Sequence, residues 1–173
     1  MISEVKLLNL FGYIMKRLNE NGVAIMNHAE RAVEYYNNNF NCSQGVFTAF
    51  ATELGIDEKL ALRLGTNFGG GERKGELCGA VAGALMVLGL RCGHCESDDL
   101  EGKANAYRIS EEFMNRFIET NGSVVCRELL GYDLTNAEDM QIIQDKNLFR
   151  TFCPEMVRSA ANILDEMIDE GIC

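Results

Sequence analysis

The stretch Ala80-Val-Ala-Gly-Ala-Leu-Met-Val-Leu-Gly-Leu90 is the longest apolar run in this chain of 173 residues. Its apolar side chains fall on most sides of a 3.6-residue period. This pattern predicts a helix over about residues 76–88 that is buried at the centre of the protein. The run is shorter than the ~18 apolar residues that a membrane-spanning helix needs, so we expect a core helix and no membrane partner.

Helical periodicity continues on both sides of this run. The sequence has no β-type alternation of useful length, and no repeat or linker divides it. We therefore predict an all-α, single-domain helical bundle of about seven to eight helices. The expected helices cover about residues 7–18, 27–40, 42–54, 58–64, 76–88, 100–121, 124–130 and 154–168, with a polar stretch between the last two.

The first expected helix belongs to an N-terminal helical extension, residues 1–25, which precedes a helical domain over residues 26–173. Its apolar stripe needs a cover, because monomers rarely leave roughly a few hundred Å² of contiguous apolar surface in water. The extension can fold back on its own domain or pack against a second copy, and we expect a homodimer. The stripe consists of Leu7, Leu8, Phe11, Ile14, Met15 and Leu18.

The charge balance excludes some partners. The chain has 16 Lys and Arg against 26 Asp and Glu, which gives a formal net charge of −10. Nucleic acids and anionic membrane surfaces bind basic faces, so we expect neither as a partner. The first residues, Met1-Ile-Ser-Glu-Val-Lys6, lack the basic start and cleavage site of a signal peptide, which predicts a cytoplasmic location.

Seven cysteines in a reducing cytoplasm indicate metal or redox chemistry more than structural disulfides. Four of them, Cys42, Cys78, Cys126 and Cys153, fall at or near predicted helix starts. Free backbone N–H groups and the positive end of the helix dipole lower the pKa of a thiol there. The resulting thiolate binds metals and attacks disulfides, so we expect the four to converge on one site. The alternative is that each is a small apolar side chain in the core.

These cysteines also carry a family resemblance. The segments Asn41-Cys42-Ser-Gln44, Phe68-Gly-Gly-Gly71 and Gly75-Glu-Leu-Cys-Gly-Ala-Val-Ala-Gly-Ala-Leu85, followed by Cys126 and Cys153, resemble the redox-active protein family named for its C, GCAxxG, C, C pattern. The resemblance covers roughly residues 29–168 and implies four cysteines of redox or metal-binding type. The family is similar in part to split-Soret cytochromes, which are helical dimeric haem proteins with an iron–sulfur centre. This chain has no Cys-x-x-Cys-His motif, so we expect no c-type haem.

Two glycines of the Cys-Gly-Ala-x-x-Gly element, Gly79 and Gly83, are four residues apart and share one helix face. Each glycine in a helix interior costs about 1 kcal/mol, which indicates a packing reason for the pair. Their small face lets either a neighbouring helix or a cofactor approach the backbone closely. We expect helix packing there and consider cofactor binding by the same glycines.

The remaining polar motifs give weaker signals. The pair in Cys92-Gly-His-Cys95 lacks the βαβ surroundings of a thioredoxin-like site, so it is either a local dithiol or metal clip or two solvent-facing thiols. We expect Cys173, at the end of the sequence, to be free, and His28 to be a surface residue. The glycine-rich loop before Cys78 lacks the order of a phosphate-binding loop, and its Arg73 and Lys74 add positive potential near the thiols.

The leading hypothesis is a redox protein whose Cys42, Cys78, Cys126 and Cys153 ligate an iron–sulfur cluster for electron transfer. One alternative uses the same cysteines as dithiol/disulfide pairs that exchange electrons with a partner protein. Another is a non-catalytic helical module stabilised by zinc, a less favoured ligand. The sequence names no electron donor or acceptor.

Overall fold

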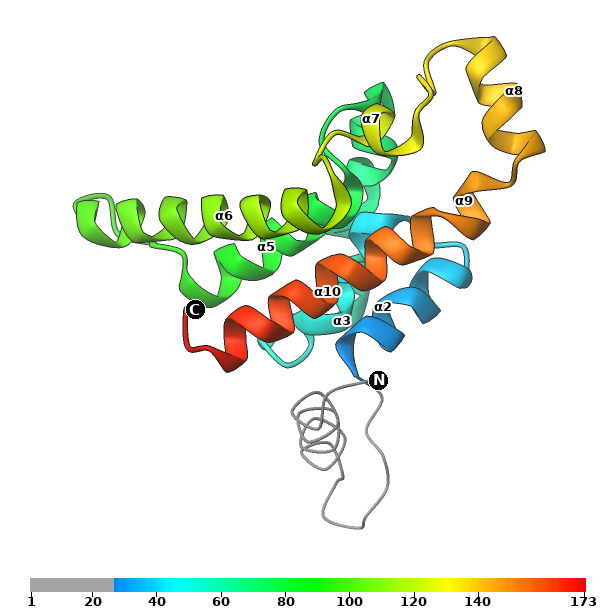
Figure 1. The fold of residues 1–173 in the computed structure, drawn as a ribbon. Helices are drawn as coiled ribbons and strands as arrows, with labels where there is room; N and C mark the ends of the chain where they lie inside the picture. The colour runs from blue at the N-terminus through cyan, green and yellow to red at the C-terminus, as the bar shows by residue number, and fades with distance from the viewer. Residues whose placement is uncertain (1–26) are drawn as a thin grey trace, which may run out of the picture.

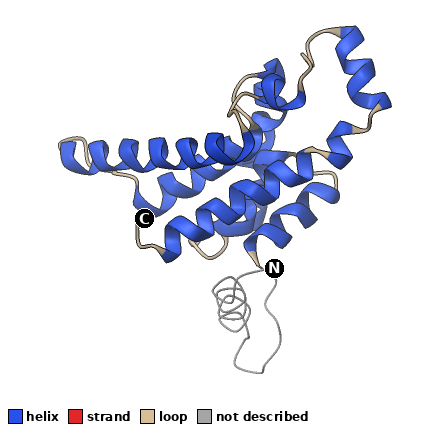
Figure 2. Ribbon diagram, viewed as in Figure 1, coloured by secondary structure: helices blue, strands red, loops and turns tan. Residues whose placement is uncertain are grey.

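The computed structural model describes residues 27–173, and this part of the chain consists of helices joined by loops and turns (Figure 2). One isolated antiparallel bridge, between Leu77 and Val125, is the only β-type pairing in that range. The predicted all-α fold is therefore confirmed for residues 27–173. Within the same range, no helix combines the length and the apolarity needed to cross a membrane.

The helices follow the predicted order closely (Figure 1). They are α2 (His28–Asn37), α3 (Cys42–Ala51), α4 (Glu58–Gly65), α5 (Gly79–Cys92), α6 (Leu100–Asn121), α7 (Cys126–Leu130), α8 (Ala137–Asp145), α9 (Leu148–Thr151) and α10 (Cys153–Asp169), with two short non-α turns, η1 (Thr66–Phe68) and η2 (Gly71–Gly75). The predicted extension, residues 1–25, lies outside the described residues. The homodimer that we inferred from its apolar stripe therefore stays a prediction.

Helix α3 shares the centre of the bundle with α5, whereas the sequence predicted α5 alone. Helix α3 packs against α2, α4, α5 and α10, and α5 packs against α3, α6 and α10. In Figure 1 α5 lies between α6 and α10. The reason is the composition of α3, in which all residues from Gly45 to Ala51 are buried although the helix includes Thr48.

The outer helices present apolar stripes to this centre. Helix α10 buries residues at helical spacing, and α6 buries Ile109, Phe113 and Phe117 on one face. The first half of α6 projects past the bundle in Figure 1, and its Leu100 and Tyr107 are exposed. The buried stripe of α10 includes Val157, Ala160, Ala161, Leu164 and Met167.

Side-chain caps fix several helix starts as predicted. The Asn41 side chain accepts from the Gln44 N–H at 2.9 Å, and Gln44 Oε1 accepts from the Asn41 N–H at 2.9 Å, which forms a capping box ahead of Cys42. Asp57 accepts from the Leu60 N–H, and Asp99 accepts from the Gly102 N–H. These local bonds explain why the starts of α3, α4 and α6 were readable from sequence.

Two predictions about helix boundaries were wrong. Helix α5 begins at Gly79 rather than near Glu76, because Glu76 and Leu77 pair with residues 124–126 instead of entering the helix. The polar stretch before α10 contains two helices, α8 and α9, that the sequence analysis did not predict. The sequence feature that indicates α8 is Asn136, whose side chain caps the start of that helix.

The prediction of a free Cys173 is also wrong. Cys173 forms a disulfide with Cys92, the last residue of α5, with their Cα atoms 5.8 Å apart. Gly171, at φ 72°, turns the chain after α10, and the Ile172 N–H then bonds to Met167 O at 3.0 Å. Arg91 Nε donates to the Cys173 carbonyl at 3.0 Å, which holds the final residues against α5.

A glycine pair in α5 tests the packing at the centre. A Cβ on Gly83 would lie 2.7 Å from Ser43 O and 3.1 Å from Val46 Cβ, whereas a Cβ on Gly89 would meet nothing within 4 Å. We expect Gly83→Ala to lower the free energy of unfolding by about 1–3 kcal/mol through overpacking. Urea denaturation measures the change.

Gly89→Ala is the matched control in the same helix. It should raise the free energy of unfolding by about 0.5–1 kcal/mol, because alanine favours the helix and meets no obstacle. Equal effects of the two substitutions would contradict the close contact between α3 and α5.

Candidate functional site

The four cysteines of the family pattern all lie at helix starts. Cys42, Cys126 and Cys153 are the first residues of α3, α7 and α10, and Cys78 is the N-cap of α5. Pro154 follows Cys153 in the first turn of α10, where its missing N–H costs no hydrogen bond. The structure places these four cysteines within about three residues of the positions predicted from sequence, relative to the helix starts.

A pair of backbone hydrogen bonds joins two of these helix starts. The Cys78 N–H donates to Val124 O at 2.7 Å, and the Cys126 N–H donates to Glu76 O at 2.6 Å. These bonds flank the bridge between residues 77 and 125 and bring the starts of α5 and α7 side by side. Arg127 strengthens the junction from outside through an ion pair with Glu76.

The helix starts border a hollow of about 350 Å³. Cys42, Cys126 and Cys153 line it, while Cys78 is buried close enough to Cys42 and Cys126 for their charges to raise its pKa. We call this hollow and its four cysteines the cysteine pocket. The other lining residues are Tyr36, Asn39, Phe40, Asn41, Thr66, Gly69, Gly70, Arg73 and Phe149.

Within residues 27–173, no group of three or more His, Cys, Asp or Glu side chains is arranged to hold a metal ion. Three of the four thiols line the hollow, and Cys78 is buried close to Cys42 and Cys126. A zinc ion bound about 2.3 Å from each sulfur would need the sulfurs within about 4 Å of one another.

A turn of left-handed backbone closes one side of the pocket. Gly70, Gly71, Glu72 and Arg73 have φ angles of 64°, 58°, 52° and 62°, a conformation that costs non-glycine residues about 1–2 kcal/mol each. The Glu76 N–H bonds to Gly71 O and closes the turn. A Cβ on Gly71 would collide with the Glu76 backbone, so only glycine fits that position.

This turn places a donor and a cation at the thiols. The Gly70 N–H bonds to the Cys42 sulfur and lowers the pKa of that thiol. The Arg73 side chain folds back over Gly70, where a Cβ would lie 3.4 Å from Arg73 Nη1, and its charge lowers the pKa of Cys126. The expectation that Arg73 adds positive potential near the thiols is confirmed, and Lys74 is exposed.

Tyr36 is a pocket residue that the sequence assigned only to an apolar stripe. Its hydroxyl donates to Phe149 O at 2.7 Å, and its position beside Cys153 lowers the pKa of that thiol. Burial and the neighbouring Cys153 and Cys42 raise the pKa of Tyr36 itself. The sequence feature that could have indicated this role is the position of Tyr36 on the apolar face of α2, shortly before Cys42.

The net pKa shifts run opposite to the sequence prediction. Backbone N–H groups do lower the pKa of Cys42 and Cys78, as expected at helix starts. Burial is the larger effect and raises the pKa of all four thiols, to about 12 for Cys126 and for Cys153. The four cysteines are therefore neutral thiols near pH 7 unless a cation joins them.

The two glycines of the Cys-Gly-Ala-x-x-Gly element, Gly79 and Gly83, are not among the residues that line the hollow. A Cβ on Gly79 would lie 2.8 Å from Phe68 O, and one on Gly83 would lie 2.7 Å from Ser43 O. Their small face is thus filled by the backbone of η1 and α3, which confirms the packing role. Cofactor binding by Gly79 and Gly83 stays a prediction.

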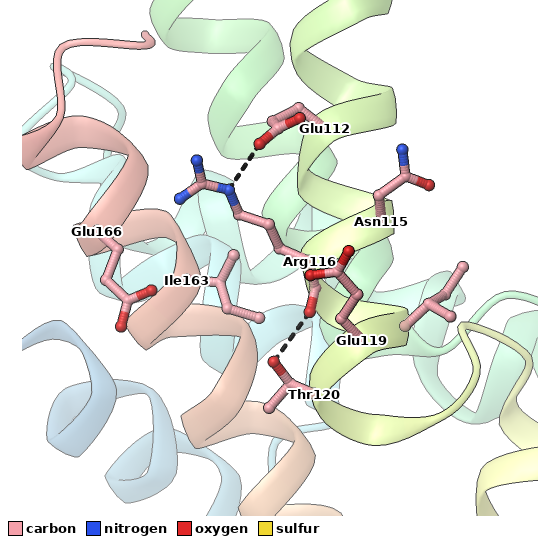
Figure 3. Close-up of a pocket in the computed structure, with 8 residues that line it drawn as sticks. Glu112, Asn115, Arg116, Glu119, Thr120, Ile163 and Glu166 are labelled. Atoms are coloured by element: carbon pink, nitrogen blue, oxygen red, sulfur yellow. Dashed lines mark hydrogen bonds and ion pairs between the residues drawn. The ribbon is translucent and has the colours of Figure 1, made fainter.

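The largest hollow lies elsewhere, between α6 and α10, and it contains no cysteine. Figure 3 shows its polar lining, in which Arg116 Nε donates to Glu112 Oε1 at 2.8 Å and Thr120 donates to Arg116 O. Arg116 also pairs with Glu170 at 2.8 Å. Its single arginine is already matched by these carboxylates, so this open groove offers a solvated charged surface rather than a redox site.

His28 is not the surface residue that the sequence predicted. Its ring stacks on Phe50 with centroids 4.0 Å apart, and its nitrogens contact Asp165 at 2.6 Å and Glu53 at 3.1 Å. The His28 side chain is largely buried, and these contacts connect the start of α2 to α3 and α10. Its carboxylate partners are far along the chain, which is why local sequence gave no sign of them.

The comparison with known families matches residues 40–167 to the family described as "Putative redox-active protein (C_GCAxxG_C_C)". The match spans all four cysteines of the pocket and most of the chain. The chain belongs to this family. The comparison with curated proteins gave no match, and neither did the comparison with solved structures. Family membership identifies redox-type cysteines and leaves their ligand and pathway open.

The raised thiol pKa values predict a specific pH dependence for the metal-free protein. A thiol whose pKa rises from its ordinary 9.0 to about 12 on folding stabilises the fold fully below pH 9. That contribution is lost as the pH increases from 9 toward 12, because the unfolded chain releases protons first. We expect the free energy of unfolding, measured in urea, to fall between about pH 9 and pH 11.

A Cys126→Ala/Cys153→Ala variant isolates the thiols from other groups that titrate in this range. Its free energy of unfolding should fall less steeply over the same pH interval, because two of the shifted groups are gone. An identical slope in the variant and the parent protein would show that these thiols are not buried.

Proposed function

We propose that this protein is an electron-transfer component that binds an iron–sulfur cluster in the cysteine pocket through Cys42, Cys78, Cys126 and Cys153. The observation that carries the proposal is that Cys42, Cys126 and Cys153 line one hollow of about 350 Å³, with Cys78 buried close to Cys42 and Cys126, although the four come from four different helix starts. Four cysteine thiolates are the usual ligand set of such clusters, and soft sulfur donors suit iron–sulfur chemistry.

The thiol pKa values favour ligands over free nucleophiles. A cysteine that attacks a disulfide needs a substantial thiolate fraction at neutral pH. Cys126 and Cys153, with pKa values of about 12, have almost none, and the pKa of Cys78 is also raised well above its ordinary value. A bound metal centre removes this obstacle, because coordination to a cation deprotonates a thiol outright.

The size of the hollow supports a cluster over a single zinc ion. One ion would require the sulfurs to close to within about 4 Å of one another. Thiols arranged around a cavity suit a ligand with several metal atoms, each held by one cysteine. The bound group would supply one-electron transfer, and the protein would supply the ligands, the hydrogen bonds to them and the burial of the site.

The surrounding residues are suited to hold and tune such a group. Backbone N–H groups of Gly70 and Ser43 point at the Cys42 sulfur, and those of Ala80 and Val81 point at the Cys78 sulfur. Hydrogen bonds to the sulfurs and burial set the reduction potential of iron–sulfur sites. Arg73 adds one positive charge beside Cys126, which offsets the negative charge of the ligand set.

Protein purified without oxygen tests the proposal directly. We expect brown protein with iron and acid-labile sulfide, and visible absorbance that bleaches on reduction by dithionite. Replacing any one of Cys42, Cys78, Cys126 or Cys153 by serine should remove most of the iron, since each supplies one ligand. Metal analysis and visible spectra give the readout.

Cys95→Ser is the matched control, because Cys95 is exposed and lies outside the pocket. It should keep the iron content and the spectrum of the parent protein. Colourless anaerobic protein with one zinc would instead identify a zinc module. Colourless metal-free protein whose pocket thiols interconvert with disulfides would identify a dithiol protein, and either result overturns the cluster.

A further inference from the structure

A disulfide and a free cysteine three residues further along the chain lie at the end of α5 that is remote from the cysteine pocket. Cys92, the last residue of α5, forms a disulfide with Cys173, and Cys95 follows three residues later as a free thiol. Figure 1 shows the final residue beside this end of α5, opposite the end near α7. The 14 residues of α5 separate the two places by about 20 Å, so their sulfurs cannot react directly.

The surroundings of this disulfide are those of an accessible bond. Cys92 and Cys173 are half-buried, and Gly93, His94 and Cys95 are exposed. The helix ends at Cys92, and the extended backbone of its C-cap, Gly93 (ψ 156°), leads directly into the loop that carries Cys95. Accessible disulfides next to a third thiol are typically labile, whereas structural ones are enclosed.

We propose that Cys92, Cys95 and Cys173 form a second redox centre, a thiol–disulfide exchange site that accepts two electrons from a dithiol reductant. This centre goes beyond the cluster proposed above and does not depend on it. The motivation is the coincidence of a half-exposed disulfide with an exposed thiol in Cys-x-x-Cys spacing.

The exchange begins within the protein. The thiolate of Cys95 attacks Sγ of Cys92, a bond forms between Cys92 and Cys95, and the bond between Cys92 and Cys173 breaks. Cys173 leaves as a thiolate and takes up the proton that Cys95 released, so this step transfers no net electrons. Arg91, whose guanidinium bonds to the Cys173 carbonyl at 3.0 Å, places a positive charge near the leaving sulfur.

The reduction follows in the exposed loop. One thiolate of the dithiol reductant attacks the disulfide between Cys92 and Cys95 and forms a mixed disulfide. The second thiol of the reductant then displaces the protein sulfur. Both cysteines become thiols with two protons and two electrons from the reductant, which leaves as a disulfide. The exchange with Cys95 thus moves the disulfide of Cys92 into the exposed loop, where a small dithiol or a dithiol protein can reduce it.

Alkylation of the full-length oxidised protein tests the internal step. The protein is incubated with iodoacetamide at about pH 8 without reductant, and peptide mass mapping locates each modified cysteine. We expect modification at Cys95 and also at Cys173, because exchange frees Cys173. In Cys95→Ser, modification of Cys173 should fall to background while the Cys92–Cys173 disulfide persists.

A second variant keeps the test decisive. After mild oxidation, Cys173→Ser should contain a disulfide between Cys92 and Cys95. Free thiols at both positions, or a parent protein in which Cys173 is never modified, would overturn the proposal. Dithiothreitol should also reduce the disulfide in the folded parent protein, and reduction only after unfolding would show a purely structural bond. Each readout is specific to these peptides, so loss of the pocket's cluster does not affect it.

Discussion

The close approach of α3 to α5 is the contact on which the candidate site depends. Gly79 and Gly83 let the backbone of α5 lie against Ser43 of α3, at distances that no larger residue would allow. Because the contact is at the starts of both helices, it brings Cys42 and Cys78 together. The start of α7 is then added through the backbone bonds of Cys126, and α10 packs against α2 and α3 and adds Cys153.

This arrangement sets two electrostatic effects against each other. Helix starts favour thiolates through their N–H groups and dipoles, and burial favours neutral thiols. Burial is the largest effect on each thiol, repulsion between neighbouring cysteines adds to it at Cys78, Cys126 and Cys153, and the outcome is a raised pKa for all four. A pocket of this kind is suited to holding a cationic centre, while the exposed Cys95 near the far end of α5 has the accessibility that thiol exchange needs.

Several parts of the structure were readable from local sequence. Asn41 and Asp57 are caps whose hydrogen bonds reach only three residues, so they fix the starts of α3 and α4 wherever the helices pack. The start of α5 was misplaced because Leu77 pairs with Val125, nearly fifty residues away. Tyr36 was assigned to the core correctly, but its effect on the pKa of Cys153 requires α2 and α10 to pack together.

The sequence by itself determined the all-α class, the order of the helices and the placement of four cysteines at helix starts, because periodicity and capping act over one or two turns. Only the tertiary structure decided that three of these cysteines line one hollow with Cys78 buried close to two of them, that the four pKa values rise and that Cys92 pairs with Cys173. Burial and long-range contact depend on which segments meet in space, and no short stretch of chain encodes that meeting.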